Sequence, residues 1–323
     1  MSEVIHHHCA VLGKPIEHSL SPVLHNTAYH ALGLDDWLYT KVEVGEADLD
    51  AFLRALDPSW AGLSLTMPLK RTIQPYGVPN DRWSRMLHVA NTAIFSWRDS
   101  SQKPDIKLYN TDVEGIERAF THSWETGGTV TNSTSSGDSN QSGKSSKGAR
   151  AVILGNGNTA LSSLAACTEL HVPGIGSIGQ VTVCARHKHE NDPMGQLAQS
   201  AYGQKIDYVQ VPLIEAPEML HQADIVINTI PAHGADETAQ RLQDSLMKHQ
   251  HNLSGRTLLD VVYDPRPTKL MQVWRNAGGT AIGGEEMLLY QAIAQVKLMT
   301  AGANIIRTAD FEEAMRSALQ EAL

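Results

Sequence analysis

The chain has 323 residues, which is more than one compact core usually holds, so we expect two domains. Hydrophobic residues make up 41% of the chain, enough for globular cores, and the net charge of -9 argues against general binding to nucleic acid or to an anionic membrane. No apolar run is long enough to span a bilayer, and the N-terminus lacks the apolar core of a signal peptide. The predicted location is the cytoplasm, with no membrane or nucleic-acid partner.

The first part of the chain alternates between strand-like and helix-like segments. Residues 9–13 predict a short buried strand, and Ser21-Pro22 predicts a helix that starts with Ser21 as N-cap and ends near Gly33. A strand is then predicted at 37–44, a helix at 46–56 and another strand at 61–66. This alternation indicates an α/β domain in which helices cover a sheet with parallel strand pairs.

Residues 125–148 differ in composition from the rest of the chain. They are mostly Ser, Thr, Gly and Asn with almost no apolar side chains. Such a segment cannot bury enough surface to offset the entropy lost on ordering. We predict a flexible surface insertion close to a domain boundary.

A second series of strands and helices follows the insertion. Strands are predicted at 150–154, 180–185, 223–229 and 257–262. Helices are predicted at 159–170, 285–301 and 309–323. This rhythm is typical of a doubly wound nucleotide-binding domain of the Rossmann type.

Cysteine and histidine give no sign of a metal site or a disulfide framework. Cys9, Cys167 and Cys184 form no CxxC pair, and we expect buried free thiols in a reducing compartment. The run His6 to His8 precedes the first strand, and adjacent histidines on an extended chain point to opposite faces. No metal is therefore predicted.

Two ionisable residues each follow directly on a strand-like segment. Lys70 closes residues 63–70, and Asp112 closes Asn110-Thr111-Asp112. A lysine and an aspartate in one cleft stabilise each other's charge and can still exchange a proton with a substrate hydroxyl. We interpret Lys70 and Asp112 as a proton-handling pair.

A glycine loop lies between the strand predicted at 150–154 and the next helix, as a dinucleotide site requires. Its first glycine permits a tight turn, its second lets a pyrophosphate approach the backbone, and its alanine allows close packing of helix on strand. The predicted cofactor-binding residues of this loop are Gly155, Asn156, Gly157, Asn158, Thr159 and Ala160.

The end of the following strand distinguishes NAD from NADP. An NAD site needs a carboxylate there, whereas residues 181–185 run into Arg186, His187 and Lys188, with no acid before Glu190. Arg186 would suit the 2′-phosphate of NADP as a planar bidentate partner. An ordinary solvated turn is the alternative. With the proton-handling pair, the site points to NADP-dependent oxidation of an alcohol.

Two further features suit a polar substrate. Ser19 and Ser21 place two hydroxyls at the start of a helix, where they could bind a carboxylate, although Ser21 could instead serve only as an N-cap. Gln291 lies inside an apolar stripe of the predicted helix 285–301. Its buried amide needs partners, either neighbouring backbone or a polar cleft that it lines.

These residues resemble the shikimate dehydrogenase family almost from end to end. The matching segments, in the family's order, are GKPIEHSLSP at 13–22, LTMPLK at 65–70, ANT at 90–92, NTD at 110–112, the glycine loop, DVVYDP at 260–265 and MLLYQ at 287–291. Some positions depart from the family pattern, among them Ser64 in place of asparagine and Asn158 in place of a loop glycine. Neither change touches Lys70 or Asp112.

The resemblance implies a role for each matching residue. Lys70 would be the catalytic acid and base, paired with Asp112, and Ser19 and Ser21 would bind the substrate carboxylate, with Tyr263 nearby. The residues that would hold the ring hydroxyls or the reacting carbonyl are Thr66, Asn91, Asp112 and Gln291. The implied reaction is reduction of 3-dehydroshikimate to shikimate with NADPH, in the pathway that leads to chorismate and the aromatic amino acids.

The resemblance also implies the division of the chain. Residues 1–111 with 285–323 would form the substrate-binding domain, to which the last helices return, and residues 112–284 the NADP-binding domain. We expect a monomer or a homodimer. Two alternatives stay open: a relative that acts on quinate and uses NAD, and a non-catalytic binding protein on the same scaffold. The second would have lost Lys70 or Asp112, and both are present.

Overall fold

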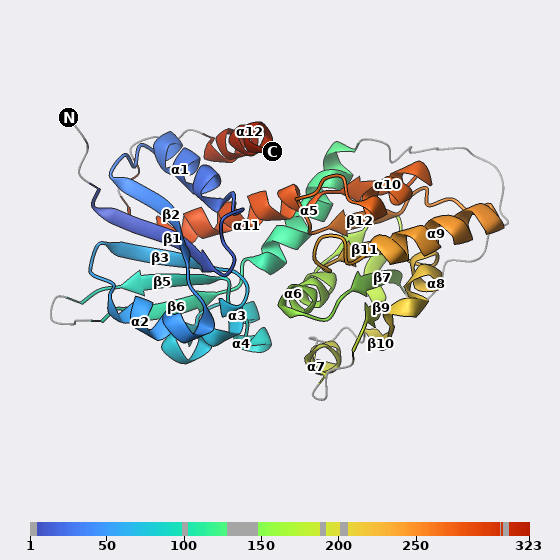
Figure 1. Cartoon of the computed structure of the whole chain (residues 1–323), viewed down its shortest axis with the longest axis horizontal. Coiled ribbons are helices and arrows are strands. Elements are labelled where there is room, and N and C mark those ends of the chain that lie inside the picture. Colours follow the sequence, from blue (N-terminus) through green and yellow to red (C-terminus); the bar gives the residue numbers. More distant parts are fainter. Residues whose placement is uncertain are drawn as a thin grey trace. The chain divides into compact units, whose positions relative to one another are not determined.

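The computed structural model describes residues 5–98, 103–127, 148–187, 192–200, 206–303, 305 and 310–323. They belong to two compact α/β units, Met1–Ile116 with Glu285–Leu323, and Glu117–Gly284 (Figure 1). The predicted two-domain α/β class is confirmed. The units divide within helix α5 (Asp112–Thr126), after Ile116, whereas the sequence placed the boundary at residue 112.

The first unit is built on a six-stranded mixed sheet with the order β2-β1-β3-β5-β6-β4. Its strands are β1 (His7–Gly13), β2 (Trp37–Glu43), β3 (Trp60–Leu65), β4 (Val78–Pro79), β5 (Thr92–Ser96) and β6 (Asp105–Tyr109). The predicted presence of parallel strand pairs is confirmed, because β1 pairs in parallel with both β2 and β3, while β5 runs antiparallel to both β3 and β6. Leucines from β1, β3 and β6 meet in the core of this unit, namely Leu12, Leu63, Leu65 and Leu108.

Six α-helices and two short 3₁₀ turns accompany this sheet among the described residues. They are α1 (Ser21–Leu32), η1 (Glu46–Asp48), α2 (Leu49–Arg54), α3 (Leu69–Thr72), η2 (Gln74–Tyr76), α4 (Arg82–Leu87), α11 (Gly284–Met299) and α12 (Phe311–Ala322). The start of α5 also belongs here. Helices α1 and α12 lie side by side, which joins the C-terminal segment to the first unit (Figure 1).

The predicted N-cap of α1 is wrong by one residue. Leu20 occupies the cap position with helical dihedral angles, so Ser21 is already the first residue of the helix. The backbone N–H of Ser21 lies 3.4 Å from the hydroxyl of Ser19. The predicted end is confirmed, because Gly33 has φ +72 and its N–H donates to the carbonyl of His30.

The second unit has the strand order β10-β9-β7-β11-β12-β13, with β8 paired to β9. The strands are β7 (Ala149–Leu154), β8 (His171–Val172), β9 (Gly176–Ala185), β10 (Asp207–Pro212), β11 (Ile225–Asn228), β12 (Thr257–Asp260) and β13 (Thr280–Ile282). Every neighbouring pair from β10 to β13 is parallel. If these strands are numbered along the chain from β7, with β8 left out, their order is 3-2-1-4-5-6. This is the doubly wound order of a dinucleotide-binding fold.

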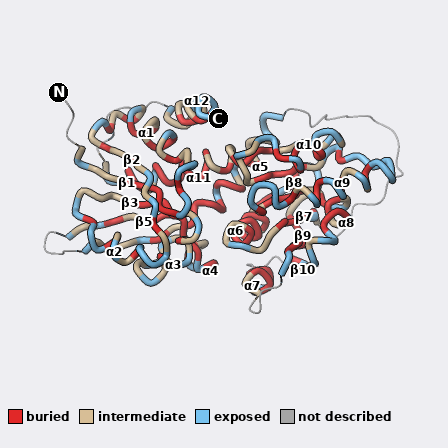
Figure 2. The backbone as a smooth tube through the Cα atoms, in the orientation of Figure 1, coloured by how far each residue is buried: buried red, intermediate tan, exposed pale blue. Residues whose placement is uncertain are grey.

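Helices and a 3₁₀ turn connect these strands: α6 (Asn158–Cys167), α7 (Pro193–Ser200), η3 (Leu213–Glu215), α8 (Ala216–Leu220), α9 (Asp236–His249) and α10 (Lys269–Asn276). The edge strand β10 has no buried residue, whereas five of the six residues of β7 and all four residues of β11 and of β12 are buried (Figure 2). Continuous apolar strands of this kind are typical of a parallel sheet covered on both faces.

Most of the predicted insertion, residues 128–147, lies outside the described residues. Its first two residues, Glu125 and Thr126, belong to α5, and its last, Gly148, leads into β7 with φ +74. Cys9, Cys167 and Cys184 are free and buried as predicted, and burial raises the pKa of all three thiols to about 12. No helix among the described residues is long and apolar enough to cross a bilayer.

A buried histidine in α1 couples the stability of the first unit to pH. His25 is 0% exposed, and its ring stacks on Tyr39 with centroids 3.9 Å apart. Burial lowers the pKa of His25 from 6.5 to about 4, although its bond to the Ser21 carbonyl acts in the opposite direction. Between pH 6.5 and pH 4, His25 of the unfolded chain therefore binds a proton that His25 of the folded chain does not.

We expect stability to be full above pH 6.5 and to fall as the pH drops toward 4. The contribution of His25 to this loss is about 3 kcal/mol between pH 7 and pH 4. Urea unfolding at several pH values would measure it, with His25→Phe as the comparison because phenylalanine keeps the stacked ring and cannot titrate. An identical pH dependence in both proteins would show that another group is responsible.

Candidate active site

The first unit gathers polar side chains at one edge of its sheet. This edge holds the carboxyl ends of β1, β3 and β6 together with the start of β5, because β5 runs antiparallel to its neighbours. Thr66 follows β3, Asn91 precedes β5, and Asn110 follows β6. The strand ends that the sequence marked as polar therefore meet at one place.

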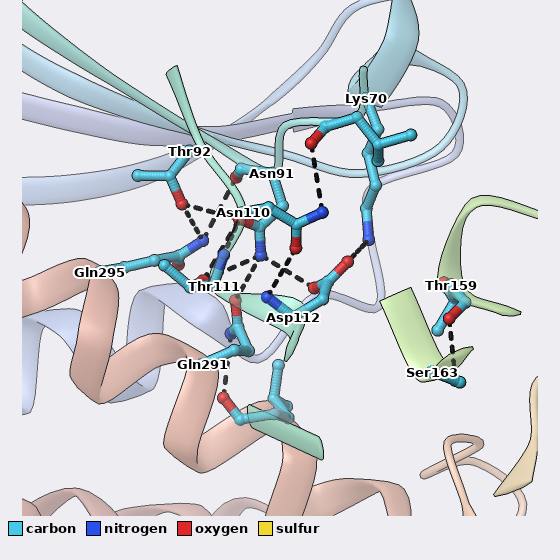
Figure 3. Close-up of polar contacts among 12 residues, drawn as sticks. Lys70, Asn91, Thr92, Asn110, Thr111, Asp112, Thr159, Ser163, Gln291 and Gln295 are labelled. Atoms are coloured by element: carbon cyan, nitrogen blue, oxygen red, sulfur yellow. Dashed lines mark hydrogen bonds and ion pairs between the residues drawn. The ribbon is translucent and has the colours of Figure 1, made fainter. Parts of the chain in front are cut away.

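Lys70 and Asp112 form a largely buried ion pair at this edge. Lys70 lies in α3 and Asp112 is the first residue of α5, and Lys70 Nζ donates to Asp112 Oδ2 at 2.5 Å (Figure 3). The two side chains are 13% and 5% exposed. A buried carboxylate needs further hydrogen bonds to offset its desolvation, and its second oxygen supplies the place for one.

Asn91 provides that bond. Its Nδ2 donates to Asp112 Oδ1 at 2.8 Å and to Thr111 Oγ1 at 2.9 Å. The backbone N–H of Thr111 donates to Asn91 Oδ1 at 2.8 Å. Because a backbone N–H can only donate, the oxygen of the amide must face Thr111, and its NH₂ group must face Asp112. Asp112 thus accepts from Lys70 with one oxygen and from Asn91 with the other.

Gln291 joins the cluster from α11. It is 8% exposed, its Nε2 donates to Leu288 O at 2.9 Å, and its Oε1 lies 3.4 Å from Asn91 Nδ2. Neighbouring backbone, one of the two alternatives considered from the sequence, is therefore one partner of the amide, and Asn91 is another. Gly115 lets α5 approach α11 this closely, because a Cβ at Gly115 would lie 2.9 Å from both Gln291 Cβ and the Met287 carbonyl.

The other predicted substrate residues of this unit lie on neighbouring segments. Ser21 is buried in α1, and its hydroxyl interacts with that of Tyr39 on β2. Ser19 is partly buried just before α1, and Thr66 donates its backbone N–H to Leu12 O at 2.9 Å. A Cβ at Gly13 would meet the Thr66 methyl, so the end of β1 packs directly on Thr66.

Sequence reasoning missed several polar residues of the cluster. Asn110 accepts from the N–H of Asp112 at 3.1 Å and thereby holds the first residue of α5. Gln295 lies on α11 and bonds to Thr92 and to Ser64. One signal was available for Gln295, because it stands four residues after Gln291 and so lies on the same face of the helix.

The second unit carries the glycine loop, whose geometry fits a dinucleotide phosphate. Gly155 follows β7 with φ +99, and a Cβ there would lie 2.6 Å from Thr229 Oγ1. A Cβ at Gly157 would meet nothing within 4 Å, so the backbone is open on that side. Gly157 is the N-cap of α6 and no side chain caps this helix. Its first turn therefore offers N–H groups and positive potential to an anion.

The end of β9 is tied to this loop. Asn156 Nδ2 donates to His187 O at 2.7 Å, and Gln210 Nε2 donates to the same carbonyl at 3.3 Å. Arg186 and His187 are exposed, and neither is acidic, so the described part of this turn fits a 2′-phosphate better than a 2′-hydroxyl. Lys188, also predicted to bind the cofactor, lies outside the described residues.

Four further predicted residues have clear positions within the second unit. Ala160 is 0% exposed in α6, as close packing of this helix on the sheet requires. Asn158 and Thr159 open the same helix. Tyr263 follows β12, where burial raises the pKa of its phenol and the neighbouring Asp264 carboxylate raises it further.

Comparison with known proteins extends over both units. A family model described as the shikimate dehydrogenase substrate binding domain matches residues 11–93. A relative named shikimate dehydrogenase (NADP(+)), from Trichormus variabilis, is 29% identical over 97% of this chain and 96% of its own. Shikimate dehydrogenase from Mycobacterium tuberculosis is 30% identical with a TM-score of 0.73, covering 98% of this chain and 100% of that one. Shikimate 5-dehydrogenase from Mycobacterium fortuitum is also 30% identical, with a TM-score of 0.69 over 97% of both chains.

Proposed function

The chain belongs to the shikimate dehydrogenase family, and we propose that it catalyses the reversible, NADP-dependent reduction of 3-dehydroshikimate to shikimate. The observation that carries this proposal is the buried Lys70–Asp112 pair, held by Asn91 at the edge of the first sheet. A pair of this kind can deliver a proton to a carbonyl oxygen as it becomes an alkoxide.

Lys70 is the acid in the reducing direction and the base in the oxidising direction. Reduction adds a hydride to the carbonyl carbon and a proton to its oxygen, and bound NADPH supplies the hydride. The Lys70 ammonium gives its proton to the oxygen and becomes a neutral amine. Asp112 positions Lys70. Asn91 donates to its Oδ1 and so fixes the carboxylate, whose Oδ2 accepts from Lys70 Nζ. Oxidation of shikimate follows the same path in reverse.

The remaining polar residues suit a ring that carries a carboxylate and hydroxyls. We assign the carboxylate to the hydroxyls of Ser19 and Ser21, with Tyr263 as a further contact. The ring hydroxyls and the reacting carbonyl are assigned to the side chains of Thr66, Asn91, Asp112 and Gln291. Amide and carboxylate groups together can both donate to and accept from a hydroxyl, which is what a polyhydroxylated ring requires.

The cofactor residues are assigned to the second unit. The loop from Gly155 to Ala160 would hold the pyrophosphate, and Arg186, His187 and Lys188 would hold the 2′-phosphate. The exposed guanidinium of Arg186 is the strongest candidate among them because it is always charged and can bind a phosphate through two hydrogen bonds.

Arg186→Ala is expected to raise KM for NADP⁺ by about tenfold or more, because a charge-assisted bidentate contact is lost. KM for NAD⁺, which lacks the 2′-phosphate, should change little. Initial rates with both cofactors at saturating shikimate would measure the ratio. The exposed Arg241 of α9 offers a control, since Arg241→Ala removes the same charge elsewhere in the unit. Equal effects of Arg186→Ala on both cofactors would contradict the assignment.

The assay of the whole proposal uses the absorbance of reduced nicotinamide with shikimate or quinate and NADP⁺ or NAD⁺. Turnover that is fastest with shikimate and NADP⁺ supports the proposed reaction. Turnover only with quinate, or only with NAD⁺, would move the chain to a different substrate or cofactor. Absence of turnover in all four mixtures would favour a binding protein on this scaffold. A cytoplasmic location and a monomeric or homodimeric state remain predictions.

A further inference from the structure

Gln295 is the most buried polar side chain of α11 among those described, and no step of the proposed reaction uses it. It is 1% exposed and accepts a hydrogen bond from Ser64 Oγ at 2.8 Å. Its Nε2 donates to Thr92 Oγ1 at 3.0 Å and to the Asn91 carbonyl at 3.3 Å (Figure 3). Gln295 therefore joins β3, β5 and α11 directly behind the residue that holds Asp112.

The direction of these hydrogen bonds is determined by the chemistry of the partners. The backbone carbonyl of Asn91 can only accept, so the NH₂ group of Gln295 must face it. The amide oxygen of Gln295 then faces Ser64, whose hydroxyl must donate. Ser64 in turn accepts from the hydroxyl of Tyr39 at 2.6 Å. The hydroxyl of Tyr39 therefore donates to Ser64, and the hydroxyl of Ser64 donates to Gln295.

The same reasoning continues toward the ion pair. Because Thr92 Oγ1 accepts from Gln295, its own proton is free to point to Asn91 Oδ1, 2.9 Å away. Thr92 and the Thr111 N–H then both donate to the oxygen of the Asn91 amide. This leaves the NH₂ group of Asn91 directed at Asp112 Oδ1, at 2.8 Å. A continuous series of hydrogen bonds therefore connects Gln295, through the side chains of Thr92 and Asn91, to the carboxylate of Asp112.

We propose that Gln295 is a positioning residue for the reaction, acting through Thr92 and Asn91 on the Asp112–Lys70 pair. The proposal rests on the proposed function for its effect on turnover, but its effect on Asn91 does not depend on any substrate. A purely structural role differs in its consequence: Gln295 would then contribute to folding while the orientation of Asn91 stayed the same without it.

Gln295→Met tests this difference, because methionine has similar length and buries well but cannot donate or accept these bonds. We expect kcat for shikimate oxidation to fall by about tenfold or more, as small misplacements of catalytic groups do. In an Asn91→Ala background the same substitution should change kcat by about twofold or less, because the route through Asn91 is already broken. An equal factor in both backgrounds would overturn the proposal.

A second measurement needs no activity. Hydrogen exchange of the Asn91 side-chain NH₂, followed by NMR, should be about tenfold faster in Gln295→Met than in the unsubstituted protein. The matched control is Thr300→Val, which removes a buried hydroxyl that donates to Val296 O at 2.8 Å just beyond α11. It should alter neither the exchange at Asn91 nor kcat.

The two measurements separate the inference from the proposed function. If the unsubstituted protein does not oxidise shikimate, the proposed function fails, and the exchange at Asn91 still decides the role of Gln295. If the protein is active but exchange at Asn91 is the same with and without Gln295, the proposed reaction stands and the positioning role is refuted.

Discussion

Lys70→Ala is expected to lower kcat for shikimate oxidation by about a thousandfold, within the range of general acid–base catalysis by a positioned side chain. KM for shikimate should change much less, because the proposed carboxylate and hydroxyl contacts lie on other residues. The nearest carboxylate, Asp112, would lose the ammonium that now lies 2.5 Å away. None of the other residues proposed to bind the substrate is a lysine that could replace the lost proton donor.

Lys70→Arg separates proton transfer from charge. A guanidinium keeps the positive charge and can pair with Asp112, but it does not lose its proton in a protein. We expect nearly the same loss of kcat as with alanine, and a smaller loss of stability. Initial-rate kinetics together with thermal unfolding would measure both, and Lys107→Ala provides a control because that lysine is exposed on β6 of the same unit. A kcat close to that of the unsubstituted protein in either Lys70 variant would refute the acid–base assignment.

The Lys70–Asp112 pair could be found in the sequence because local chemistry marks it. Each residue follows the end of an apolar strand and stands near hydrogen-bonding side chains, and the carboxyl ends of parallel strands meet at one edge of a sheet. The glycine loop was predictable for the same reason, since its turn, its open side at Gly157 and the helix that follows are all set by neighbouring residues. The parallel order of the second unit follows from its alternating strands and helices.

The support behind the pair was not predictable, because its contacts join distant parts of the chain. Ser64 and Gln295 are separated by 231 positions, and Gln295 and Thr92 by 203. A buried serine or threonine in a strand has no sequence pattern that names its partner. The antiparallel strand β5 belongs to the same class, because its pairing with β3 and β6 depends on register rather than on local propensity. The N-cap of α1 failed for a local reason, since Leu20 already has helical dihedral angles.

Asp112→Asn should also lower kcat strongly, although it replaces only one carboxylate oxygen by an NH₂ group. Lys70 Nζ and Asn91 Nδ2 are both donors, and the two carboxylate oxygens accept from one each. An amide has only one oxygen, so its NH₂ group must face one of these donors. We expect kcat to fall by about a hundredfold, because either Lys70 or the Asn91 amide loses its fixed position.

The substitution should also cost stability, by about 3 kcal/mol, since it leaves the charge of Lys70 buried without its counter-charge. Kinetics must therefore be measured well below the unfolding temperature, so that the loss of kcat reports the site and not the folded fraction. Asp105→Asn is the matched control, because Asp105 also pairs with a cation, Arg98 at 2.6 Å, but does so on the surface of the same unit. A surface pair contributes little, so this control should change neither kcat nor stability by a measurable amount. Equal behaviour of the two variants would mean that the buried carboxylate has no special part in the reaction, and the role of Asp112 as the partner of Lys70 would have to be abandoned.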